Sequence, residues 1–190
     1  MQLWEGGPYW AECNVGASKP EECGLYFWWG DTVGHAGDWS FDRSHCPIYG
    51  KGNAELQSLG YIDSTGNLTA AHDAATAHLG APWRMPTDAE FFALISNCTT
   101  TWTSRNGVNG RLVTGKGAYA SKSIFLPAAG NGYDSSLYYL GLSGNYWSST
   151  PYSVYSYYAW CLGFYSGYFY RGYSSRYYGQ SVRPVRGFAK

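Results

Sequence analysis

One stretch of the sequence, residues 144–186, restricts the possible fold more than any other. Most of the chain's 19 tyrosines lie there, interleaved with Ser and Gly rather than with charged residues. From Trp160 to Phe169, large apolar residues alternate with small or tyrosyl ones at period two, the repeat of a β-strand. Ser166-Gly167 fits a two-residue turn. The stretch is therefore predicted to form an antiparallel hairpin.

The turn sets the register of this hairpin, with Tyr165 opposite Tyr168, Phe164 opposite Phe169, Gly163 opposite Tyr170 and Leu162 opposite Arg171. Directly paired residues share a face. One face is therefore expected to collect Trp160, Leu162, Phe164 and Phe169, and the other Cys161, Gly163, Tyr165, Tyr168 and Tyr170. Arg171 does not fit the apolar face.

The tyrosyl face has two interpretations. It could be the solvated face of an amphipathic sheet, but such faces usually carry Lys, Glu and Thr. Rigid amphipathic rings beside small, adaptable residues are instead typical of antibody paratopes. The composition therefore favours a binding surface.

Length and charge limit the class of protein. At 190 residues the chain is about one domain long and can bury a sizeable core. Its formal net charge is zero, so it offers no electrostatic footprint for nucleic acid or anionic lipid. No apolar run reaches the length of a membrane span, and the N-terminal MQLWEGG lacks a basic and apolar leader. We therefore expect that the protein neither binds nucleic acid nor inserts into a membrane.

The five cysteines cannot all pair within one chain. They are Cys13, Cys23, Cys46, Cys98 and Cys161. Their spacing matches no known zinc pattern, although Cys13, Cys23, His45 and Cys46 could supply four ligands. Buried free thiols, or one disulfide between Cys13 and Cys23, are the preferred alternatives. His35 and His45 are expected to be solvated loop residues.

Two helices are predicted. Residues 73–79, DAATAHL, read as an alanine-rich helix that Gly80 ends. In MPTDAEFFALISNC, Thr87 and Glu90 fit a capping box, and apolar residues at 91, 94 and 95 share one face, which should pack on a sheet.

Strands are predicted along the rest of the chain. Residues 3–32 are predicted to form short strands whose aromatic side chains contribute to the core. Residues 34–53 are predicted to form an irregular surface loop. Residues 100–114 read as a hairpin that turns at Asn106-Gly107 or at Asn109-Gly110. Residues 123–126 form a strand that Pro127 ends, residues 128–150 a long structured loop, and SVRPVR a strand at an edge or an end. The predicted class is α+β: an antiparallel sheet core with two short helices and long irregular loops.

Several segments resemble a known family. WAECNVGASKPEECGLYFWWGDT, DAATAHLGAPWRMPTDAEFFALISNCTTTWT, SIFLPAAG, GNYWSST and GQSVRPVR occur in order across nearly the whole chain. They are similar to the major paralogous domain of Fibrobacter succinogenes, common in Bacteroidetes and their bacteriophages. That domain belongs to the formylglycine-generating enzyme branch of the C-type lectin fold. The resemblance implies one C-type lectin-like domain over residues 1–190.

The C-terminal part looks more specifically like the hypervariable region of a variable protein diversified by a diversity-generating retroelement. In such systems reverse transcription at template adenines rewrites codons, typically AAC, and the rewritten residues form a ligand-binding surface. This resemblance implies a scaffold over residues 1–130 and a variable region within 131–190. The implied ligand-binding residues are Tyr152, Ser153, Tyr155, Ser156, Tyr157, Tyr158, Cys161, Gly163, Tyr165, Tyr168, Tyr170, Tyr173, Ser174, Ser175, Tyr177 and Tyr178, with Tyr138, Tyr139 and Asn145 as further candidates. The implied scaffold residues are Trp147, Trp160, Leu162, Phe164, Arg176, Val182 and Arg183.

Three functions are compatible with this fold and composition. The first is binding of a protein or cell-surface receptor, from a phage tail or a bacterial surface, without a cofactor. The second is calcium-independent carbohydrate binding, since the Glu-Pro-Asn, Gln-Pro-Asp and Trp-Asn-Asp triplets of calcium-dependent lectins are missing. The third, an enzyme of formylglycine-generating type, would need a second thiol near Cys161. Receptor binding is the function we expect, and catalysis is not.

Overall fold

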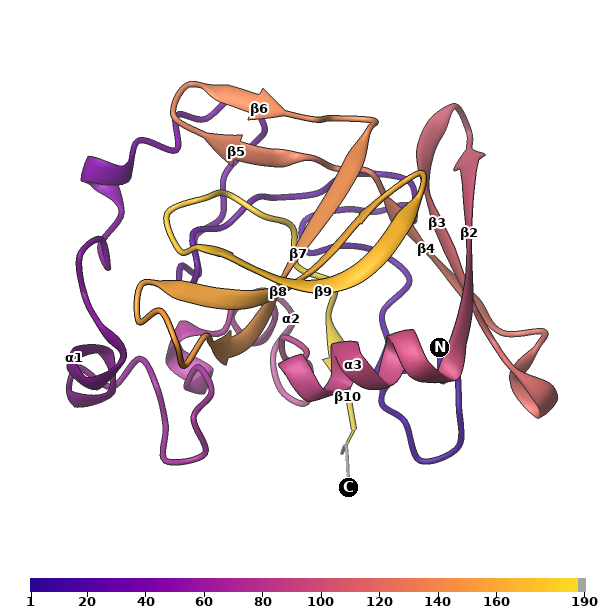
Figure 1. Ribbon diagram of the computed structural model, residues 1–190, viewed down its shortest axis with the longest axis horizontal. Helices are drawn as coiled ribbons and strands as arrows, with labels where there is room; N and C mark the ends of the chain where they lie inside the picture. The colour runs from indigo at the N-terminus through magenta and orange to yellow at the C-terminus, as the bar shows by residue number, and fades with distance from the viewer. Residues whose placement is uncertain (188–190) are drawn as a thin grey trace.

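The protein, described over residues 1–187 of a computed structural model, is built from antiparallel sheets and short helices (Figure 1). This architecture is α+β, as predicted. The last three residues of the expected domain, 188–190, lie outside the described residues. In residues 1–187 no helix is long and apolar enough to cross a membrane.

The elements are short. The strands are β1 (Tyr9–Trp10), β2 (Cys98–Arg105), β3 (Val108–Gly115), β4 (Ser123–Pro127), β5 (Asn131–Tyr133), β6 (Ser136–Tyr138), β7 (Ser143–Pro151), β8 (Tyr158–Tyr165), β9 (Tyr168–Ser175) and β10 (Val185–Arg186). The α-helices are α1 (Asn53–Ser58), α2 (Ala74–Leu79) and α3 (Asp88–Asn97), and single 3-10 turns cover Arg43–His45, Ala70–His72 and Gly117–Tyr119. The strands pair as β1–β10, β2–β3–β4, β5–β6 and β7–β8–β9.

The β7–β8–β9 sheet lies between two hydrophobic cores. Trp147 of β7 and its partner Cys161 of β8 belong to the core that contains Trp29. The next pair, Tyr146 and Leu162, belongs to the core that α3 covers. In Figure 1, α3 runs along one side of this sheet, while β5 and β6 lie on the other side. The middle of the sheet is therefore buried on both faces.

The helix signals of the sequence are confirmed. At the start of α3, the backbone N–H of Glu90 donates to the Thr87 hydroxyl at 3.2 Å, and the Glu90 carboxylate accepts from the Thr87 N–H at 2.8 Å. Phe91 and Leu94 are buried against the sheet. Helix α2 begins after Asp73, whose carboxylate accepts from the Thr76 N–H at 2.8 Å.

Other boundaries differ from the predictions. The hairpin of β2 and β3 turns at Asn106-Gly107, where both residues have positive φ, so this alternative is the correct one. Residues 128–150, predicted as a loop, contain β5, β6 and most of β7. Helix α1 was not predicted. SVRPVR contributes only the two residues of β10, paired with β1.

Candidate ligand-binding surface

The hairpin of β8 and β9 has the predicted register. Tyr165 pairs with Tyr168, Phe164 with Phe169, Gly163 with Tyr170 and Leu162 with Arg171. Leu162 and Phe164 are buried, whereas the side chains of Tyr165, Tyr168 and Tyr170 are 40–63% exposed. The hairpin thus presents phenol rings on one face of its tip and supports them from the other.

Arg111 of β3 holds the turn of this hairpin. Its Nη2 donates to the carbonyl oxygens of Tyr165 at 2.9 Å and Ser166 at 3.0 Å, and its Nη1 donates to the Thr100 hydroxyl. Arg111 is itself buried. The two acceptors at the turn are backbone carbonyls, so these two contacts hold the tip whichever side chains it carries.

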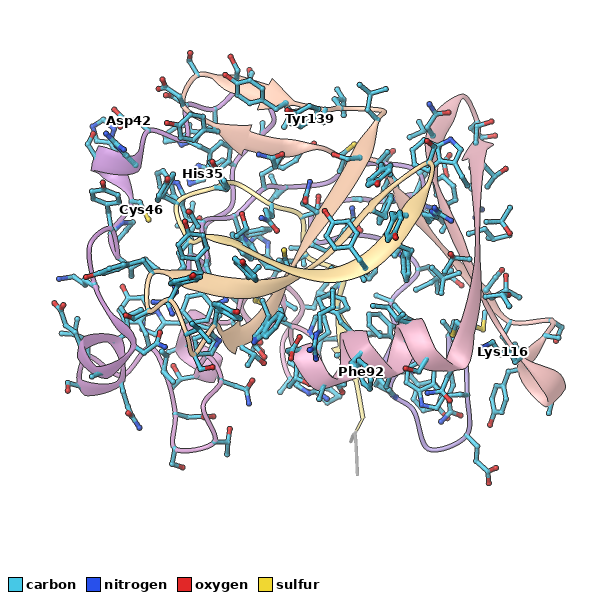
Figure 2. All side chains as sticks on the ribbon, in the orientation of Figure 1. His35, Asp42, Cys46, Phe92, Lys116 and Tyr139 are labelled. Carbon is cyan, nitrogen blue, oxygen red and sulfur yellow. The ribbon has the colours of Figure 1, made fainter. Side chains whose placement is uncertain are left out.

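Arg171, which did not fit the apolar face, covers an aromatic side chain. Its guanidinium lies 4.4 Å from the ring centre of half-buried Trp160 and forms an ion pair with Asp88 of α3 at 3.2 Å. It also lies over Phe92, which Figure 2 shows on α3. A cation on an aromatic face is favourable, so Arg171 links the hairpin to the helix.

A second group of rings surrounds Trp160. Tyr152 stacks on Tyr173 with 4.3 Å between ring centres and meets Trp160 edge-on at 4.7 Å. Tyr155 and Tyr158 extend the group, 5.7 Å apart. Stacked and edge-on pairs at these separations are favourable. The loop between β7 and β8 is therefore packed through its own tyrosines.

A groove runs along the other side of the hairpin. It consists of two adjoining hollows of about 430 and 350 Å³, which share Asn131, Tyr139 and Asn145. Tyr165 and Tyr170 line one end of the groove, and Figure 2 shows Tyr139 at the edge of the molecule opposite Phe92. Tyr139 has a positive φ of 59°, unusual for a non-glycine residue.

Most of the predicted ligand-binding residues reach solvent. The exposed ones are Tyr138, Tyr139, Ser153, Tyr155, Tyr157, Tyr165, Tyr168, Tyr170 and Tyr173. Tyr152, Ser156, Tyr158, Ser174, Tyr177, Tyr178 and the further candidate Asn145 are half-buried. Of the predicted scaffold residues, Trp147, Leu162, Phe164, Arg176, Val182 and Arg183 are buried.

Three predicted ligand-binding residues are buried, which corrects their assignment to an exposed face. Cys161 lies in the core beside Trp147, because that end of the face packs inward. Gly163 lies beneath a ring: a Cβ there would come within 2.6 Å of Tyr170. Gly163 therefore leaves room for the ring of Tyr170. Ser175 is buried and lines a cleft.

That cleft was not anticipated. It holds about 390 Å³ and lies between residues 46–51 and the side chains of Tyr157, Tyr158 and Tyr177, with Arg176 among its lining residues. Residues 46–51 belong to a stretch without periodicity, so nothing in the pattern placed them beside the C-terminal tyrosines. Tyr49, an aromatic residue of that stretch that lines the cleft, was the available signal.

The family model for the Lcl C-terminal domain matches residues 9–186, nearly the whole chain. The chain belongs to the Lcl C-terminal domain family. This family is related to the variable proteins of diversity-generating retroelements with C-type lectin domains, which agrees with the broader part of the resemblance. No curated protein and no solved structure matches the chain. The Lcl C-terminal region includes the hairpin, the groove and the cleft.

The structure decides between the alternatives for the cysteines of this Lcl C-terminal domain, and it differs from the prediction for one of its histidines, His35. All five thiols are free, so the Cys13–Cys23 disulfide is not formed. Within residues 1–187, no three His, Cys, Asp or Glu side chains are grouped as metal ligands, so the four zinc candidates do not converge. His45 is exposed as expected, but His35 is packed, stacked on Trp39 with 4.3 Å between ring centres.

Proposed function

We propose that this protein is a hypervariable ligand-binding protein whose tyrosine surface binds a protein receptor on a target cell. One observation carries the proposal: the exposed rings of Tyr165, Tyr168 and Tyr170 project from a hairpin whose backbone is fixed by Arg111 and by the core beneath. Tyrosine gives a large contact area at low entropic cost and is enriched at binding hot spots. A patch of about 800 Å² per partner is enough for a specific complex.

The proposal includes the origin and setting of this surface. We propose a C-type lectin-like scaffold of the Fibrobacter succinogenes type, diversified by a retroelement and displayed on a phage tail or a bacterial surface. Sequencing of the neighbouring DNA tests this. A reverse transcriptase gene and a near-copy of the 3′ coding segment, with AAC at the tyrosine codons, are expected. Neighbouring DNA without either would contradict diversification.

Substitution of the exposed tyrosines tests binding. Tyr168→Ala and Tyr170→Ala are each expected to weaken binding of fluorescently labelled protein to receptor-bearing bacterial cells by roughly 30-fold, equal to about 2 kcal/mol for a hot-spot residue. Their melting temperatures should stay near that of the parent, because substitutions of exposed residues usually change stability by less than about 0.5 kcal/mol.

The control is Phe164→Ala. Phe164 is 1% exposed, and the loss of such a buried ring costs about 3 to 5 kcal/mol of stability. It is a better reference than half-buried Trp160, which lies among the tyrosines. If Tyr168→Ala and Tyr170→Ala lowered the melting temperature as much as Phe164→Ala, the rings would be core rather than contact surface.

The groove favours carbohydrate as a second candidate ligand class. Its walls combine the rings of Tyr138 and Tyr139 with the amides of Asn131 and Asn145, and flat rings beside amides suit the apolar faces and hydroxyls of sugars. Binding to a glycan array that persists in the presence of EDTA would support this candidate. Binding to deglycosylated receptor with unchanged affinity would exclude it.

A catalytic function is not proposed. The related enzyme chemistry needs an accessible pair of thiols, whereas Cys161 is buried in the core. Burial raises the pKa of its thiol to about 12, which opposes formation of the reactive thiolate.

A further inference from the structure

The cleft between residues 46–51 and the C-terminal tyrosines contains a buried charge. Arg176 is 3% exposed, and its guanidinium lies 4.5 Å from the ring centre of Trp29. Within residues 1–187, no carboxylate comes within salt-bridge distance of it. Burying a cation without a counter-ion is unfavourable, so this feature requires an explanation beyond packing.

Neutral oxygen atoms satisfy only part of this guanidinium. Its Nε donates to the Tyr158 carbonyl at 3.1 Å, its Nη1 to the Lys51 carbonyl at 3.5 Å, and its Nη2 to the Asn53 side-chain oxygen. A guanidinium has five N–H groups, and these contacts use three of them. Two N–H donors therefore remain for another acceptor.

The walls of the cleft add no negative charge. None of the described lining residues is acidic, and the ring of Tyr49 meets that of Tyr177 edge-on at 5.7 Å. Lys51, the other cation of the lining, pairs with Glu55 at 2.8 Å. Burial lowers the pKa of Arg176 to about 10, so it still carries its charge at neutral pH. Apolar walls strengthen the attraction between this charge and an anion.

We infer that this cleft takes the carboxylate of an aspartate or glutamate side chain from the protein partner. The inference rests on the proposed function, because the cleft is continuous with tyrosines of the binding surface. A planar carboxylate matches the guanidinium fork and needs only one or two donors. A phosphate or sulfate group would call for further cations, and the cleft has one uncompensated charge. Arg176 would thus give the binding surface a constant preference for carboxylates, beneath tyrosines that are predicted to vary.

The test uses blocked amino acids as probes. N-acetyl-glutamate N-methylamide and its neutral match, N-acetyl-glutamine N-methylamide, are titrated into the ¹⁵N-labelled protein and followed by NMR. The glutamate probe is expected to bind with a millimolar Kd, at least about 10-fold tighter than the glutamine probe. Its shifts should be confined to the residues that line the cleft, in 46–51, 157–158 and 175–177. Equal affinities, or shifts elsewhere, would overturn the inference.

Variants that change the charge of single residues add a control for folding. Arg176→Gln should abolish the preference for glutamate, but it also removes contacts to Tyr158 and Asn53. Lys51→Glu leaves those contacts in place and puts a carboxylate at the cleft, so it should weaken glutamate binding by about 10-fold or more. It also removes the partly exposed pair with Glu55, which should lower the melting temperature only slightly. Lys116→Glu makes the same charge change on the far side of the molecule from Cys46 (Figure 2) and should have no effect. Equal losses in Lys51→Glu and Lys116→Glu would indicate nonspecific attraction and contradict the inference.

Two further probes distinguish the source of the anion. Inorganic phosphate and methyl glucuronide should both bind more weakly than the glutamate probe, and tighter binding of either would overturn the choice of a protein carboxylate. The proposed function fails separately. If Tyr168→Ala still weakens cell binding while the glutamate probe does not bind, only the cleft inference is wrong. If the probe binds while Tyr168→Ala and Tyr170→Ala leave cell binding unchanged, only the proposed surface is wrong.

Discussion

Single residues on one face of a strand differ in exposure. Cys161 and Tyr165 point to the same side of β8, yet Cys161 is 4% exposed and Tyr165 is 46% exposed. Near Cys161 the face is closed by Trp147 and Val182 of the same core, whereas at Tyr165 the core has ended. Period-two alternation assigns a side chain to a face. It contains no information about which distant segment covers that face.

Alkylation of the thiols tests the buried position of Cys161. Cys161, Cys46 and Cys98 are buried, and burial raises the pKa of their thiols to about 12, 11 and 11. Because the thiolate is the reactive form, iodoacetamide at pH 8 should modify half-buried Cys13 and Cys23 first. The other three should react only in denaturant, as peptide mass spectrometry would show. If Cys161 in the native protein were modified as fast as Cys13, its side chain would have to be exposed, and the buried position would be wrong.

At the scale of elements, Arg111 connects the scaffold to the hairpin of β8 and β9. Arg111→Met would remove its bonds to the carbonyls of Tyr165 and Ser166. The loss of charged hydrogen bonds of this kind costs about 1 to 3 kcal/mol. Amide hydrogen exchange at the turn should accelerate by at least about 10-fold relative to the middle of β8, because the tip is no longer held.

Arg105→Met is the matched control for Arg111→Met. Arg105 lies on the adjoining strand β2, and its exposed side chain forms an ion pair with Glu21 at 3.5 Å. Its removal should leave exchange at the hairpin turn unchanged. If both variants gave the same exchange profile, Arg111 would stabilise the sheet generally and would have no specific part in positioning the tip.

Elements with local signals could be predicted from the sequence, and elements fixed by distant contacts could not. The hairpin of β8 and β9 has its own turn and alternation, so its pairing could be predicted correctly. Helix α3 has its capping box, so its first residues could be predicted correctly as well. Strand β7 has no alternation, because neighbouring Tyr146 and Trp147 enter different cores. Its Gly144 is needed where a Cβ would lie 2.2 Å from Phe164, but in sequence it favours a loop. The cleft combines segments more than 100 residues apart, so only the tertiary fold reveals it.

At the scale of the whole molecule, the regions predicted as scaffold and as variable share their cores. Trp147 and Val182 complete the core that contains Phe27, and β10 pairs with β1 at the other end of the chain. The backbone N–H of Val15 donates to the Val182 carbonyl at 2.9 Å. The C-terminal segment is therefore part of the support on which its own tyrosines are displayed.

Arg183 joins three parts of the chain, and its substitution tests this shared architecture. Its fully buried guanidinium donates to the carbonyls of Ala11 and Glu12, to the Asn14 side chain at 2.9 Å and to the Phe125 carbonyl at 2.9 Å. Arg183→Met would remove this donor from all four oxygen atoms, of which those of Asn14 and Phe125 are in buried contacts. We expect the free energy of unfolding, measured by urea denaturation, to fall by about 3 to 5 kcal/mol, since each unsatisfied group costs about 1 to 3 kcal/mol and relaxation recovers part of it.

The control for Arg183→Met is Arg186→Met, three residues along the chain. Arg186 is exposed and lies over the rings of Tyr9 and Trp83 at 5.8 and 5.0 Å. Exposed cation–π contacts contribute about 0.5 to 1 kcal/mol, so this variant should lose no more than that. Similar losses in the two variants would mean that the buried guanidinium does not hold the N-terminal segment, β4 and the C-terminal segment together. The tyrosine surface would then need another source of rigidity.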